Sequence, residues 1–149
     1  MKFSLAREAL LRPLQLVVGV VERRQTLPIL SNVLLSIDDQ RLSITGTDLE
    51  VEIIGDTETS EVFESGEITV SARKLVDIVR SLPEGAKIDF ASGDGKALVT
   101  SGRSRFTLAT LPSNEFPSVD GGDKTLELSM KGSVMKNFIA ATSFAMAQQ

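Results

Sequence analysis

The chain repeats one supersecondary unit, and this repeat limits its possible folds more than any other feature of the sequence. Apolar residues at helical spacing predict three helices, at residues 6–25, 72–82 and 131–149, which begin about 60 residues apart. Alternating polar and apolar segments predict one strand before each helix and three strands after each of the first two. The predicted strands are residues 2–5, 32–37, 41–45, 49–54, 66–70, 87–91, 97–100, 105–110 and 125–129. The sequence thus predicts a strand–helix–three-strand unit repeated twice, followed by the opening of a third copy.

The third copy has no strands after its helix within these 149 residues. A strand and a helix without partner strands cannot bury their apolar faces, so we expect residues 120–149 to begin a second domain after a first domain of residues 1–119. Proline, serine, aspartate and two glycines cluster at 117–123, which is typical of a domain boundary. The alternative is a terminal helix that docks on the first domain.

The predicted helices are basic although the whole chain is acidic, with a net charge of −4. They contain nine basic and three acidic residues, which leaves seven basic and seventeen acidic residues elsewhere. An acidic protein with one positive layer attracts polyanions such as nucleic acid at that layer alone. The alternative is that the helices expose lysine and arginine to solvent without a partner.

Helical spacing places part of this charge on one side of each helix. Arg12 and Arg23 lie opposite the apolar stripe of the first helix, in which Pro13 is expected to introduce a kink. Arg73 and Arg80 share the far side of the second helix. Because the chain has no Trp or Tyr, a base-stacking platform is not expected, and the pattern favours phosphate contact without sequence reading.

The composition argues against an active site, a metal site and a cofactor. With no histidine and no cysteine, the chain lacks the usual zinc ligands, a thiol nucleophile and a histidine base. Asp48, Glu50 and Glu52 are expected on one face of a strand, where solvated acids are the usual outcome. No apolar run approaches the roughly 18 residues of a membrane span, and no signal peptide is recognisable, which predicts a cytoplasmic protein without membrane contact.

The predicted strand near residues 103–111 has an unusual pattern. Phe106 and Leu108 share one face, and Arg103 and Arg105 flank them. Exposed at a sheet edge, this strand would favour pairing with another chain, and its arginines could meet acids there. An ordinary interior strand explains the spacing equally well.

Four segments resemble the bacterial beta sliding clamp, the processivity subunit of the replicative DNA polymerase. They are TLPIL at 26–30, GTDLE at 46–50, SGRSRF at 101–106 and LPSNEFP at 111–117. The resemblance runs in order from residue 1 to residue 149. It implies an α+β DNA-clamp fold with helices on one face of antiparallel sheets, and a ring of two subunits, each with three similar domains, around duplex DNA.

The same resemblance implies roles for individual residues. Arg24 matches a DNA-contacting arginine after the first helix, Gln149 matches a DNA-contacting glutamine after the third, and Arg23 is expected to add a contact. Phe106 and Leu108 match apolar positions of the subunit interface. The implied ion-pair partners for acids of the second subunit are Lys74, Arg103 and Arg105. The pocket that binds the polymerase, the clamp loader and repair proteins lies in domains outside these residues.

Three functional hypotheses follow. The first is a non-catalytic ring that binds double-stranded DNA without sequence specificity through Arg12, Arg24, Arg73 and Arg80. The second is a sequence-specific DNA-binding regulator, which predicts strong discrimination between operator and random duplex. The third is an enzyme that uses a carboxylate such as Asp48.

Overall fold

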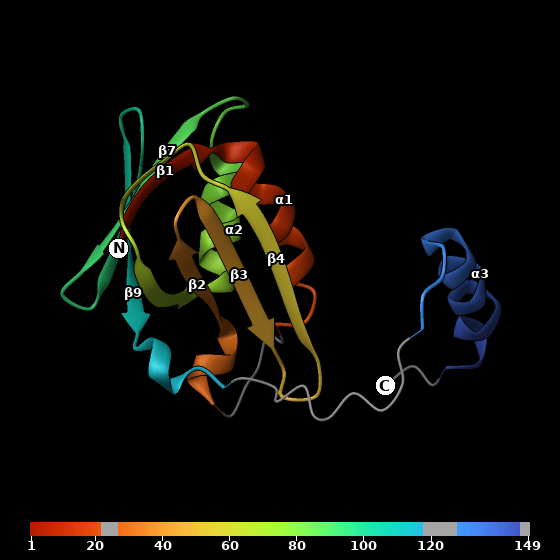
Figure 1. Cartoon of the computed structure of the whole chain (residues 1–149). Helices are drawn as coiled ribbons and strands as arrows, with labels where there is room; N and C mark the ends of the chain where they lie inside the picture. Colours follow the sequence, from red (N-terminus) through yellow and green to blue (C-terminus); the bar gives the residue numbers. More distant parts are fainter. Residues whose placement is uncertain (22–26, 118–127, 147–149) are drawn as a thin grey trace. The chain divides into compact units, whose positions relative to one another are not determined.

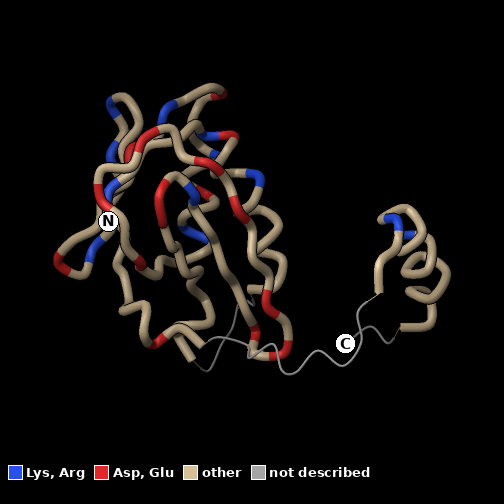
Figure 2. Tube along the Cα trace, in the orientation of Figure 1, with Lys and Arg blue, Asp and Glu red and all other residues tan. Residues whose placement is uncertain are grey.

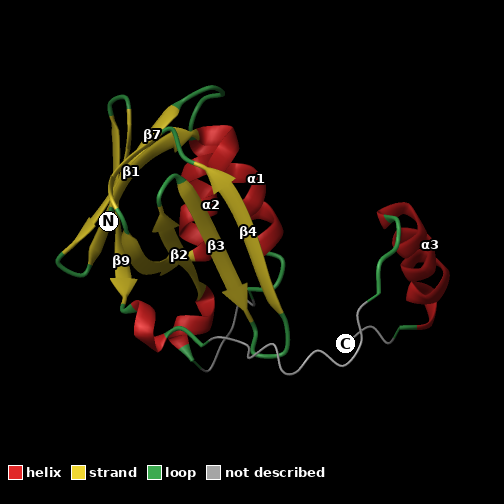
Figure 3. Cartoon of the chain, viewed as in Figure 1, coloured by secondary structure: helices red, strands yellow, loops and turns green. Residues whose placement is uncertain are grey.

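The structure is a computed structural model that describes residues 1–21, 27–117 and 128–146. The chain divides into two compact units, Met1–Val119 and Asp120–Gln149, and each is considered by itself. Figure 1 follows the chain from the N-terminus to the C-terminus, and Figure 3 separates its helices, strands and loops.

In its described residues, the first unit combines one sheet of nine strands with two α-helices. The sheet order is β4-β3-β2-β6-β9-β8-β7-β1-β5, and every pairing is antiparallel. Helices α1 and α2 lie side by side against one face of the curved sheet (Figure 1). The strands are β1 (Lys2–Ala6), β2 (Asn32–Asp38), β3 (Arg41–Thr47), β4 (Glu52–Glu58), β5 (Glu61–Glu64), β6 (Gly66–Ser71), β7 (Lys87–Gly93), β8 (Lys96–Ser101) and β9 (Ser104–Leu111). The helices are α1 (Arg7–Val17), α2 (Ala72–Ser81) and two short 3-10 helices, η1 (Pro28–Ser31) and η2 (Ser113–Glu115).

The predicted α+β fold is confirmed, and the two repeats interlock. The first repeat is β1, α1, β2, β3 and β4, and the second is β6, α2, β7, β8 and β9. The opening strand of each repeat pairs with the other repeat, because β1 pairs with β7 and β6 pairs with β2. Neither repeat therefore completes its part of the sheet without the other.

The core forms where the apolar faces of the helices meet the sheet. Leu10 and Leu14 of α1 and Leu75 of α2 are fully buried. From the strands, Phe3 and Phe90 stack with their ring centroids 5.0 Å apart. These side chains fix the helices on the sheet, so the opposite helical faces point away from the core.

The first helix ends eight residues earlier than the sequence predicted, at Val17. The apolar stripe continues through Val18 and Val21, but after Val17 the backbone follows tighter turns, in which the N–H groups of Val20 and Val21 donate to the carbonyls three residues earlier. The end of α1 packs closely on β3, where a Cβ on Gly46 would lie only 2.6 Å from Cγ1 of Val17. Pro13 lies inside α1, and the kink expected at this residue stays a prediction.

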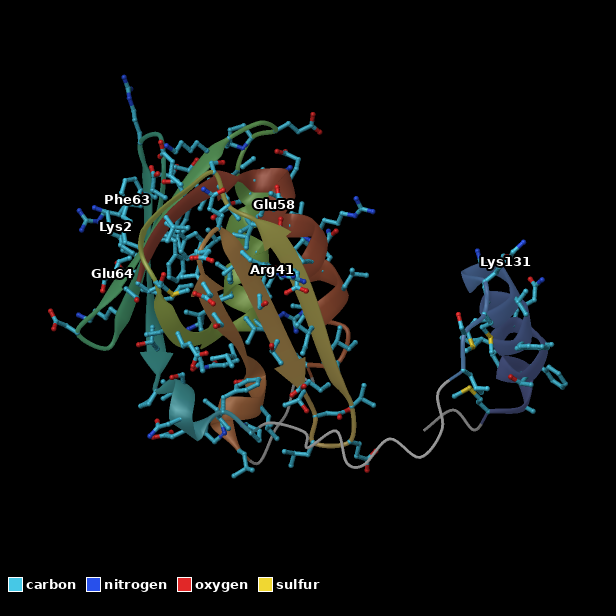
Figure 4. All side chains as sticks on the ribbon, in the orientation of Figure 1. Lys2, Arg41, Glu58, Phe63, Glu64 and Lys131 are labelled. Atoms are coloured by element: carbon cyan, nitrogen blue, oxygen red, sulfur yellow. The ribbon has the colours of Figure 1, made fainter. Side chains whose placement is uncertain are left out.

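Two strand predictions were wrong. Strand β4 begins at Glu52 instead of residue 49, because residues 48–51 form a turn. Strand β5 was not predicted at all. It pairs with β1, with Phe3 opposite Val62, and the Lys2 ammonium lies 5.3 Å from the centre of the Phe63 ring (Figure 4).

The second unit contains helix α3 (Gly132–Thr142) followed by the 3-10 helix η3 (Ser143–Ala145), so α3 is shorter than the predicted 131–149. Within its described part, residues 128–130 are not a strand, and the rest of the predicted strand 125–129 lies outside the described residues. The apolar side chains of this unit are exposed, including Phe138 at 60% and Ile139 at 58%. That residues 120–149 open a second clamp domain stays a prediction.

Candidate nucleic-acid and subunit interfaces

Helix α2 has one apolar face and one basic face. Leu75, Val76 and Val79 are buried against the sheet, and the exposed residues on the other side are Arg73, Lys74, Asp77 and Arg80. The sequence placed Arg73 and Arg80 on this side, but it assigned Lys74 only to the subunit interface. Arg73 and Arg80 line a hollow of about 450 Å³ beside the end of α1. Lys74 lines a different hollow, beside Leu108 of β9, and so faces another side of the helix than Arg73 and Arg80.

Of the two arginines of α1, only Arg12 is exposed. Arg7 is 14% exposed and connects the helices: its Nε donates to the Val79 carbonyl at 3.0 Å, and it pairs with Glu8 at 3.0 Å. The Gly85 backbone N–H donates to Glu8, and this bond, together with Arg7, holds the pKa of the Glu8 carboxyl below its usual range. Arg7 is thus a structural residue, whereas Arg12 remains available to an external anion.

We use the term basic face for Arg12, Arg73 and Arg80. In the described part of the chain, no carboxylate lies within ion-pair distance of these three side chains. No ion pair therefore holds these cations, and although Asp77 on the same side of α2 offsets one charge, the face keeps a net positive charge that attracts phosphates.

The strands have the opposite charge. They contain eight acidic and five basic residues, whereas α1 and α2 contain two acidic and five basic residues. Figure 2 shows acidic residues along the strands and in the loops that join them. Two of the strand cations are paired, Arg41 with Asp56 at 2.6 Å and Lys87 with Glu61 at 2.9 Å (Arg41 is labelled in Figure 4). Each pair raises the pKa of its cation. Charge is thus separated between the helical layer and the sheet.

Three of the predicted DNA contacts, Arg23, Arg24 and Gln149, lie outside the described residues. Arg12, Arg73 and Arg80 lie on exposed helical surface. Their contact with DNA stays a prediction.

The second candidate surface is the edge of β9. Strand β8 pairs with β9 along its whole length, but β6 pairs only with Thr110 and Leu111. From residue 104 to residue 109, the other edge of β9 therefore has no strand partner among the described residues. Strand β9 is thus an interior strand at residues 110–111 and an edge strand over the rest of its length. The two alternatives, an edge strand and an interior strand, each describe a part of it.

The side chains near this edge are partly buried in the core and partly exposed. Leu108 is 5% exposed and belongs to the core, and Phe106 is half-buried against it. Arg103 and Arg105 are exposed, and Lys74 lies beside Leu108 around a hollow of about 380 Å³. Both apolar residues thus serve the fold of this unit, and a subunit contact here would use mainly the backbone edge and the exposed part of Phe106.

The carboxylates considered as a metal site do not lie on one strand face. Asp48 and Glu50 belong to the turn before β4, where Oδ1 of Asp48 accepts the backbone N–H groups of Glu50 and Val51 at 2.9 and 2.7 Å. These bonds lower the pKa of Asp48. Among the described residues, no group of three acidic side chains could hold a metal ion.

Comparisons with known proteins agree with this arrangement. Residues 1–120 match the family of the DNA polymerase III beta subunit, N-terminal domain. The chain belongs to this family.

Relatives of this beta subunit family align with the whole chain. The chain is 59% identical to the beta sliding clamp of Pseudomonas putida and 48% identical to that of Escherichia coli, over all 149 residues in each case. It spans 41% of the length of these curated relatives.

Solved clamp structures have the same fold. A Pseudomonas aeruginosa sliding clamp bound to griselimycin is 58% identical and superposes with a TM-score of 0.96, covering the whole chain and 40% of that clamp. The beta subunit of Caulobacter crescentus, at 39% identity, gives a TM-score of 0.95 over the same share of each chain. In the described part of the chain, no helix is long and apolar enough to cross a membrane.

Proposed function

We propose that this chain forms the N-terminal part of a non-catalytic sliding clamp, a ring that encircles duplex DNA and tethers the replicative polymerase. The main support is the alignment of all 149 residues with beta sliding clamps, at up to 59% identity among the relatives described above. The unpaired basic face on the helices, opposite an acidic sheet, adds independent physical support.

The proposed mechanism is topological. A closed ring leaves DNA only by opening or by sliding off an end, so it needs no tight contact. Arg12, Arg73 and Arg80 supply a weak attraction to phosphates that is equal at every base pair, and sliding breaks no specific bond. Arg23, Arg24 and Gln149 are proposed as further DNA contacts.

Ring closure is proposed to use the free edge of β9. Backbone N–H and C=O groups at residues 104–109 would pair with a strand of a second subunit, as exposed edges commonly do. Phe106 would add apolar contact next to the core residue Leu108. Lys74, Arg103 and Arg105 would pair with acids of that subunit.

The remaining partners and the location follow from the clamp proposal. The polymerase, the clamp loader and repair proteins would bind through domains beyond these residues. The protein would work in the cytoplasm, without a cofactor and without a catalytic residue of its own.

Retention on DNA distinguishes the clamp from the other hypotheses. Loaded as the full-length ring, the clamp should remain far longer on a closed circular duplex than on the same duplex after linearisation. Equal retention on both forms would exclude topological binding. A regulator would instead prefer one sequence over random duplex, and the comparisons support the clamp over that alternative.

A further inference from the structure

A buried polar bridge lies at the seam between β6 and β9, where the two halves of the sheet meet. Strands β6 and β9 share just two register pairs, Thr69 with Leu111 and Val70 with Thr110. At this seam Nδ2 of Asn32 donates to Oγ1 of Thr69 at 3.0 Å, and the Thr69 hydroxyl donates to the Leu111 carbonyl at 2.9 Å. Hydrogen bonds to one atom, Oγ1 of Thr69, thus link the three strands β2, β6 and β9.

The two side chains of this bridge are buried, and the direction of each of its hydrogen bonds is defined. Thr69 is fully buried and Asn32 is 7% exposed, so water does not readily replace either bond. A hydroxyl has one proton, and because the Asn32 amide already donates to the oxygen, that proton points to the Leu111 carbonyl. Loss of the hydroxyl would leave a buried amide N–H and a carbonyl without their partners, which costs more than the loss of an exposed hydrogen bond.

The bridge lies where β9 separates from β6. Leu111 and Thr110 are paired with β6, and the unpaired edge begins at the next residue, Ala109. Asn32, Leu108 and Leu111 line the same hollow beside this edge. The bridge therefore lies at the point where the two strands diverge and next to the free edge of β9.

We propose that Thr69 is a positioning residue for the subunit-interface strand: its hydroxyl bridge holds β9 against β6 so that residues 104–109 are presented as a straight, pairing-competent edge. The effect on the ring rests on the proposed function, whereas the effect on β9 does not.

The test compares Thr69→Val with Thr47→Val. Thr47 is also fully buried, and its hydroxyl also bridges two backbone groups, accepting from Leu49 N–H at 3.0 Å and donating to the Val51 carbonyl at 2.8 Å, in the turn between β3 and β4. Both variants therefore lose an equivalent buried hydroxyl, but only one loses it at the β9 seam. Thr69→Ser keeps the hydroxyl and serves as the rescue.

Amide hydrogen exchange of the 149-residue chain gives the first readout. In Thr69→Val, exchange at residues 104–111 should accelerate about tenfold relative to the sheet as a whole, with wild-type rates in Thr69→Ser. Thr47→Val should accelerate exchange near residues 47–51 and leave β9 unchanged. Equal protection of β9 in Thr69→Val and Thr47→Val would overturn the proposal.

The second readout is dissociation of a full-length clamp, made by joining these residues to the remaining domains of the Pseudomonas aeruginosa protein. Thr69→Val should dissociate into subunits several-fold faster than Thr47→Val at matched thermal stability. Faster exchange in β9 with equal dissociation of the two variants would overturn the role in ring closure. If the wild-type chimera forms no dimer at all, the proposed function fails instead, and the exchange result still decides whether the bridge orders β9.

Discussion

The close contact between β4 and α1 makes Gly55→Ala an informative substitution. A Cβ at residue 55 would point toward the helix and lie 2.9 Å from Cβ and 3.2 Å from the carbonyl oxygen of Pro13. Both neighbouring atoms belong to rigid groups, so the helix or the strand must move. Overpacking of this kind costs about 1–3 kcal/mol. The reduced entropy of the unfolded chain returns about 0.4–1 kcal/mol, which leaves a net loss of roughly 1–2 kcal/mol.

Gly93→Ala is the matched control. Gly93 ends β7, its φ is not in the left-handed region, and no atom lies within 4 Å of an added Cβ. Urea unfolding and thermal melting should show Gly93→Ala within about 0.5 kcal/mol of wild type. Gly55→Ala should melt roughly 5–10 °C lower. If the two variants are equally stable, the packing argument for the position of α1, and with it of Arg12, is wrong.

Three further outcomes are expected. In a full-length ring, the double variant Arg73→Ala, Arg80→Ala should bind DNA with a weaker salt dependence: the slope of log K against log salt should fall by about 0.9 for each phosphate that is no longer neutralised. The control variant Arg41→Ala, Lys96→Ala on the strands should leave this slope unchanged. Equal slopes for the two variants would argue against the basic face. The Asp48 pKa lies below its ordinary value of 3.8, so its stabilising contribution is present above that pH and is lost as the pH falls through the folded pKa. Asp48→Asn keeps the acceptor for the turn and should therefore reduce the loss of stability on acidification in equilibrium unfolding from about pH 5 to about pH 2.5, and an unchanged acid profile would contradict this assignment. Under the proposed function, the complementary interface of the ring lies in another domain, so the 149-residue chain alone should not form a closed dimer in analytical ultracentrifugation. A discrete closed dimer would refute that expectation.

Local sequence patterns were sufficient for much of the fold. Helix α2 was predicted at residues 72–82 and is observed as Ala72–Ser81, because its apolar and charged residues follow a helical period without interruption. The same period placed Arg73 and Arg80 on the exposed side. Side-chain spacing reports which face of an element avoids water, and this holds before any tertiary contact forms.

Features that depend on distant residues were not predictable in this way. Strand β5 is only four residues long, and it pairs with β1, where Val62 lies opposite Phe3 from some sixty residues earlier in the chain. The close packing of Val17, the last residue of α1, against Gly46 of β3 also joins residues from distant parts of the chain. In the turn at Asp48, the backbone N–H groups of Glu50 and Val51 donate to the Asp48 carboxylate, and these bonds favour a turn where the alternating residue pattern predicted a strand.

The sequence alone determined the repeat, the α+β class and the segregation of positive charge to the helices, since each follows from residue type and spacing. Only the tertiary structure decided which cations stay available: Arg7 binds the end of α2, Arg41 and Lys87 pair with acids, and Arg12, Arg73 and Arg80 remain exposed. It also decided that β9 is interior at Thr110 and Leu111 and an edge from residue 104 to residue 109. Pairing and burial are properties of residues brought together from distant parts of the chain, so no local pattern encodes them.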